Sequence, residues 1–137
     1  MNAYSKNLRN EIKKSKKIYF YDLGIRNAII QNFNSLGLRT DTGQLFENYI
    51  ISEYIKANHN NQKHAKYYFW RSFQQQEIDL IEEIDGKLNA IEIKWNQNKK
   101  AKFSAIFTEN YAVNEKIIIN KQNYTSIPSL IFSNEII

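Results

Sequence analysis

Two carboxylates and a lysine on neighbouring apolar segments are the residues best suited to chemistry. Asp79 lies in Glu-Ile-Asp-Leu-Ile, Glu92 and Lys94 lie in Ile-Glu-Ile-Lys-Trp, and Asp85-Gly86 separates them. An Asp-Gly pair between strand-like segments favours a type I′ hairpin turn, which needs positive φ at both central residues. In that register Asp79 pairs with Glu92, and alternation of side chains places Lys94 on the same face. Two carboxylates this close repel each other unless a positive group lies between them, and a divalent metal ion and a lysine would serve.

The other residues of the hairpin decide whether these charges belong to an ordinary solvated face. Charged residues on strands are mostly exposed. Here both faces carry apolar side chains: one face holds Ile78, Leu80, Ile91 and Ile93, and the charged face also holds Ile81, Leu88 and Ala90. This pattern predicts strands covered on both sides, where a charge needs a partner or a function. Glu77 pairs with Lys94 in this register, and it could be the ion-pair partner of that lysine or an edge residue in solvent.

The composition is that of one folded domain. The chain has 137 residues, of which 42% are hydrophobic and 24% charged, and it has no cysteine. It therefore has no disulfides, thiolate metal sites or cysteine nucleophiles. No apolar segment reaches the roughly 18 residues of a membrane span. Residues 1–17 are polar and basic, so we expect no secretory signal and a cytoplasmic protein.

The net charge of +5 comes mainly from two basic clusters. The first comprises Lys6, Arg9, Lys13, Lys14, Lys16 and Lys17, and the second, after the Glu92 strand, comprises Lys94, Lys99, Lys100 and Lys102. Such charge allows binding to nucleic-acid phosphates, although a chain rich in Ile, Asn and Lys can be basic by composition alone. The residues that we expect to contact nucleic acid are Arg71, Gln76, Lys99 and Lys100. For Arg71 and Gln76, a simple polar turn before a strand is the competing interpretation.

Hydrophobic periodicity predicts an α/β fold with a mixed central sheet. We expect a polar segment over 1–16 and one domain over 17–137. The expected strands cover 17–21, 66–71, 76–84, 87–95, 115–120 and 129–132. The expected helices cover 23–33, capped by Asp22, 43–58, capped by Thr42, and 101–112.

The order of these elements and their charged residues resembles the PD-(D/E)XK nucleases, the restriction-endonuclease-like superfamily with an αβββαβ core. The matching residues are Glu47 on the helix, Asp79, Glu92 and Lys94. Ile78 stands where the name-giving proline would be.

A narrower resemblance covers residues 15–132. The segments that carry it are Lys17–Ala28, Thr42–Ile50, Tyr68–Arg71 and Gln76–Ile81, and they resemble the C-terminal domain of unknown function in predicted prokaryotic AAA+ superfamily ATPases. The chain contains no G-x-x-x-x-G-K-[ST] phosphate loop. The resemblance therefore implies a C-terminal module whose partner is an ATPase module preceding it, with a homo-oligomer as a further possibility.

The resemblance also implies roles for individual residues. Asp79, Glu92 and the carbonyl of Ile93 would bind Mg²⁺ or Mn²⁺. Lys94 would orient or deprotonate the attacking water, or neutralise charge on the phosphate. Glu47 would reach the site through a water or a second metal ion.

Two functions follow from this pattern as hypotheses. One is metal-dependent hydrolysis of DNA. The other is a non-catalytic module that binds nucleic acid or a protein, or that oligomerises, with the aromatic strand 66–71 as its interface.

The role of the helix glutamate is also open at this stage. Glu47 could be an ordinary exposed residue, and Glu53 competes with it for the place nearest the sheet.

Overall fold

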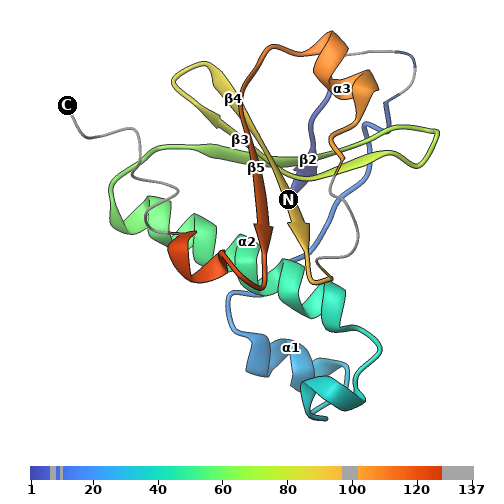
Figure 1. Cartoon of the computed structure of the whole chain (residues 1–137), viewed down its shortest axis with the longest axis vertical. Helices are drawn as coiled ribbons and strands as arrows, with labels where there is room; N and C mark the ends of the chain where they lie inside the picture. Colours follow the sequence, from blue (N-terminus) through green and yellow to red (C-terminus); the bar gives the residue numbers. More distant parts are fainter. Residues whose placement is uncertain (7–8, 10, 97–101, 128–137) are drawn as a thin grey trace.

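A five-stranded mixed sheet forms the centre of the computed structural model, which describes residues 1–6, 9, 11–96 and 102–127 (Figure 1). The strands follow the order β1-β2-β3-β4-β5. Their bounds are β1 Asn2–Ala3, β2 Lys66–Arg71, β3 Glu77–Ile84, β4 Lys87–Lys94 and β5 Val113–Asn120. The helices are α1 Leu23–Ile29, α2 Thr42–Asn60 and α3 Ala105–Asn110, with short 3₁₀ turns η1 Leu36–Leu38 and η2 Tyr124–Ser126. The expected α/β fold is confirmed, and α2 to β5 give the order αβββαβ.

The β3–β4 hairpin has the predicted turn and register. Asp85 has φ 50° and Gly86 has φ 75°, as a type I′ turn requires. The antiparallel ladder runs from Ile84 opposite Lys87 to Leu80 opposite Ile91. Because β4 also pairs in parallel with β5, the sheet is mixed, as expected. The strand expected at 129–132 lies outside the described residues.

Helix α2 covers one face of the sheet because its apolar side chains repeat with helical spacing. The core on this face consists of Phe46, Ile50, Ile51, Tyr54, Leu80, Ile91, Ile93, Ile119 and Ile127. The expectation that Thr42 caps this helix is wrong, because the N-cap is Asp41. The Asp41 side chain makes no capping hydrogen bond. Its carboxylate instead forms ion pairs with Arg39 Nε at 2.8 Å and with Arg26 Nη1 at 3.1 Å.

Helix α3 covers the opposite face (Figure 1). It is shorter than the predicted 101–112 and begins after Ser104, whose side chain accepts from the Phe107 N–H. The core here consists of Trp70, Ile78, Ile81, Leu88, Ala90, Phe107 and Tyr111. Ile78 therefore does not share a face with Leu80 as expected. Strict alternation fails near the start of β3, where the β2–β3 register shifts between Tyr68 and Trp70.

The N-terminal segment differs most from expectation. Residues 17–21 form no strand, because the Asn48 side chain satisfies both backbone groups of Phe20: its Oδ1 accepts at 3.0 Å and its Nδ2 donates at 2.6 Å. Within residues 1–16, β1 instead pairs in parallel with β2. Strand β2 is consequently interior, and its Phe69 and Trp70 are fully buried. The suggestion that β2 is an interface stays a prediction.

Helix α1 contributes little to the core. Asp22 caps it as predicted, accepting from the Ile25 N–H at 3.1 Å, but the helix ends at Ile29 rather than at residue 33. No residue of α1 is buried against the described part of the chain. The large hydrophobic side chains exposed in and around this helix are Ile18, Tyr21, Ile25, Ile29, Ile30, Phe33, Leu36 and Leu38. Among the described residues, no helix has both the length and the apolarity that crossing a membrane would need.

Candidate functional site

The lysine of β4 lies between the two predicted carboxylates. Lys94 Nζ is 3.1 Å from Asp79 Oδ2 and 2.7 Å from Glu92 Oε2. The β3–β4 ladder ends just before these residues, and the Ile93 N–H donates to Asp79 Oδ2 at 2.8 Å. Just beyond this ladder, the structure brings together the three side chains that the sequence predicted to be neighbours.

Glu92 is the most deeply buried of these three side chains. It is only 3% exposed, and its Oε1 is buried with no hydrogen-bond partner among the described residues. Burial, and then the neighbouring charge of Asp79, raise the pKa of Glu92 to about 7. Burial alone would lower the pKa of Lys94, but Asp79 and Glu92 raise it above its ordinary value. Lys94 is therefore an ammonium at neutral pH, and Glu92 can gain or lose a proton there.

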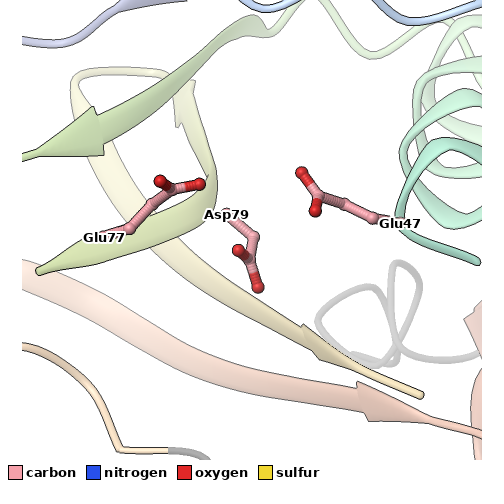
Figure 2. A group of neighbouring side chains, drawn as sticks. All are labelled: Glu47, Glu77 and Asp79. Atoms are coloured by element: carbon pink, nitrogen blue, oxygen red, sulfur yellow. The ribbon is translucent and has the colours of Figure 1, made fainter. Parts of the chain in front are cut away.

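Asp79 also belongs to a second cluster of acidic side chains, together with Glu47 and Glu77. Figure 2 shows Glu47 reaching from α2 towards Glu77 and Asp79 on β3, and one carboxylate oxygen of each lies within 4.8 Å of the others. Their side chains are partly exposed for Glu47 and Glu77 and buried for Asp79. Helical spacing explains the position of Glu47, because it follows Phe46 of the buried stripe at the edge of the sheet.

Lys17 and Tyr19 complete this group from the N-terminal segment. Lys17 Nζ binds Glu47 Oε1 at 3.2 Å and also Glu77, and Tyr19 Oη donates to Glu47 Oε1 at 2.5 Å. Burial alone would lower the pKa of Lys17, but Glu47 and Glu77 raise it. Burial and the charge of Glu47 raise the pKa of Tyr19, which therefore stays protonated. Sequence reasoning missed both roles, although both residues lie in a segment that carries the family resemblance.

The remaining predicted residues have mixed outcomes. Glu53 pairs with Lys56 on the exposed side of α2 at 2.9 Å, so Glu47 is the helix glutamate that faces the sheet. Glu77 neither pairs with Lys94 nor stands free in solvent, because Lys17 and Arg71 bind it.

The residues expected to contact nucleic acid are only partly placed. Arg71 Nη2 lies 2.5 Å from Glu77 Oε2. Gln76 is exposed and accepts from Ser104 Oγ. Lys99 and Lys100 lie outside the described residues. Arg71 and Gln76 therefore border the acidic groups, and contact with a phosphodiester stays a prediction.

The donor set suits a hard divalent cation. Asp79 lies beside Glu92 through Lys94, and it also lies beside Glu47 and Glu77. The Oε1 atom of Glu92, which has no partner among the described residues, offers a buried anionic ligand. Carboxylate oxygens are the ligands that Mg²⁺ and Mn²⁺ prefer. The candidate ligands are therefore Asp79 and Glu92, with Glu47 beside them, while the role expected for the Ile93 carbonyl stays a prediction.

The fold and the site together define an α/β protein with carboxylates and ammonium groups at one end of a mixed sheet. Comparison with known families gives a match over residues 42–128 to the domain of unknown function DUF4143. The match covers more than half of the chain, and the chain belongs to this family. It spans Glu47, Asp79, Glu92 and Lys94, and Lys17 lies outside it. No curated protein and no solved structure match the chain.

Proposed function

We propose that this chain is a cytoplasmic, metal-dependent nuclease-like domain of the PD-(D/E)XK class that hydrolyses phosphodiesters of DNA. The observation that carries the proposal is the position of Lys94 between Asp79 and Glu92, with one oxygen of Glu92 left without a partner. Burying a charged group without full compensation is costly, so such an arrangement points to a function. The resemblance further suggests that the domain works as the C-terminal module of an AAA+ ATPase.

Asp79 and Glu92 would hold Mg²⁺ or Mn²⁺, which supplies a bound water of lowered pKa and neutralises charge on the phosphate. Lys94 stays protonated beside Asp79 and Glu92. It is therefore suited to stabilise the extra negative charge of the transition state rather than to accept a proton. Glu92 has a pKa of about 7 in the metal-free protein, so a cation bound to its carboxylate would have to displace a proton near neutral pH.

Glu47 and Lys17 would set the other side of the site. Lys17 Nζ binds Glu47 and Glu77, and so occupies carboxylate oxygens that a cation would otherwise use. Its ammonium also reduces the net negative charge that an incoming phosphodiester would meet.

Metal binding is the first test. Mn²⁺ or Mg²⁺ should raise the melting temperature of the purified chain, because a ligand that binds only the folded form stabilises it. The Asp79→Ala variant should lose this gain. As a matched pair on α2, Glu47→Gln should weaken the gain, and Glu53→Gln should leave it unchanged.

Cleavage is the second test. Supercoiled plasmid with Mn²⁺ should be nicked by the wild-type chain, and not by Lys94→Ala. Metal binding without cleavage of any DNA or RNA substrate would reject the catalytic part of the proposal.

Exposed apolar side chains on α1 and in the segment after it favour a second candidate, a protein-interaction module. The side chains of Ile25, Ile29 and Phe33 are 56%, 63% and 73% exposed, and apolar residues grouped in this way mark interaction sites. If this is the principal role, Ile29→Lys should abolish association with the ATPase module while metal binding persists.

A further inference from the structure

A second polar site lies at the turn end of the β3–β4 hairpin. A cavity of about 450 Å³ opens there between the end of α2, the hairpin and β5. Its floor includes Tyr54, Asn58, Glu82 and Asn89, and its rim includes Lys63, His64, Asp85 and Glu115. Glu82 follows Asp79 by three residues on β3, about 10 Å along the strand. The cavity is therefore separate from the candidate metal site.

Glu82 is a buried carboxylate surrounded by neutral donors. It is 4% exposed. Its Oε1 accepts from Asn89 Nδ2 at 2.9 Å and from Tyr54 Oη at 3.2 Å, and its Oε2 accepts from Asn58 Nδ2. Burial and the charge of Glu82 raise the pKa of Tyr54, so this hydroxyl remains a donor. Among the described residues, Glu82 has no ion pair.

Asn58 adds an unused acceptor beside this carboxylate. It is fully buried, and its Nδ2 donates to both Glu82 and Tyr67 Oη, the latter at 2.8 Å. A carboxylate accepts only, so the amide must turn its nitrogen towards Glu82. Asn58 Oδ1 is then left without a partner in the described part of the chain. An unsatisfied buried acceptor is costly, which favours a ligand that donates to it.

The floor therefore combines a negative charge with unused acceptor capacity. Each carboxylate oxygen has two lone pairs, so Glu82 Oε2 can accept once more, next to Asn58 Oδ1. A cation that donates several N–H groups would match both features. A guanidinium has this property, because its N–H groups lie in one plane and two neighbouring ones can donate to two neighbouring acceptors.

We propose that this cavity binds a small organic cation carrying a guanidinium group, with Glu82 and Asn58 as its acceptors. The volume lies in the range of small-molecule sites. The proposal is independent of metal binding and of nuclease activity. The guanidinium could belong to a free metabolite or to an arginine side chain of a peptide, and the test separates the two.

The test is an NMR titration of the ¹⁵N-labelled wild-type chain. The probes are n-butylguanidinium, its neutral analogue n-butylurea, and a capped Gly-Arg-Gly peptide. We expect saturable shifts of the side-chain amide signals of Asn58 and Asn89 with n-butylguanidinium, and at least tenfold weaker binding of n-butylurea. Equal binding of the peptide would assign the arginine side chain as the ligand, whereas its failure would assign a free compound.

The Glu82→Gln variant keeps the shape of the carboxylate and removes its charge. It should weaken binding of n-butylguanidinium at least tenfold. If this variant does not fold, the comparison of the two butyl probes on the wild-type chain still decides. Absence of a saturable shift, or equal affinity for n-butylurea, would overturn the proposal.

Discussion

Replacing Glu92 with glutamine should stabilise the metal-free protein above neutral pH. The folded-state pKa of Glu92 is about 7, against an ordinary value of 4.5. Between these values the folded chain holds a proton that the unfolded chain has lost, so the free energy of unfolding falls as pH rises. The penalty is absent below the ordinary pKa and complete above about pH 7.

The size of this penalty follows from the two pKa values. They differ by about 2.5 pH units, and each unit corresponds to about 1.4 kcal/mol, so the full penalty is about 3 kcal/mol. Over the interval from about pH 5 to pH 8, the wild type should lose about 2.5 kcal/mol relative to Glu92→Gln.

Urea denaturation in EDTA, followed by tryptophan fluorescence, measures this difference. Glu53→Gln, which removes an exposed carboxylate from α2, is the matched control and should keep the wild-type slope. Parallel stability curves for wild type and Glu92→Gln would refute the reasoning, because Glu92 would then not be protonated in the folded state at intermediate pH. If Glu92 is a metal ligand as proposed, added Mg²⁺ should flatten the wild-type curve, because the cation and the proton would compete for the same oxygens.

Three further changes test the core, the Lys17 contacts and the turn. Phe107→Ala should cost about 3–5 kcal/mol of unfolding free energy in urea, because this side chain of α3 is fully buried against the sheet. Lys17→Met should tighten Mn²⁺ binding several-fold in calorimetry, because its ammonium no longer competes for Glu47 and Glu77; weaker binding would contradict this reasoning. Gly86→Ala should lower the unfolding free energy by about 1–2 kcal/mol, because φ is 75° there; an unchanged urea midpoint would contradict the turn assignment.

The hairpin and helix α2 could be predicted from the sequence because local patterns determine them. The Asp85-Gly86 turn sets the register, and the register brings Asp79, Glu92 and Lys94 together. The helical period of α2 predicts the helix itself, but it left Glu47 and Glu53 as competitors for the place nearest the sheet, and only the structure selects Glu47. For the turn and the helix the decisive residues lie within a few positions of one another, so propensity and periodicity are sufficient.

The faces of β3 could be predicted only in part. Leu80 and Ile81 point to opposite sides as alternation requires, but Ile78 joins Ile81 on the α3 side. The register shift between β2 and β3 that accompanies this break depends on how the two strands pack together. The residues of β3 alone do not specify how β2 pairs with them.

Only the tertiary structure decided which residues complete the two sites. Lys17 reaches Glu47 and Glu77 across 30 and 60 positions of sequence, and Asn48 replaces strand pairing at Phe20. Glu82 looked like any polar strand residue until α2 and β4 enclosed it. These contacts join segments far apart in the chain, and they depend on the path of the loops and on which polar groups become buried together. Local periodicity specifies neither, so the sequence by itself determined the hairpin and its three charged residues, and the three-dimensional packing determined what surrounds them.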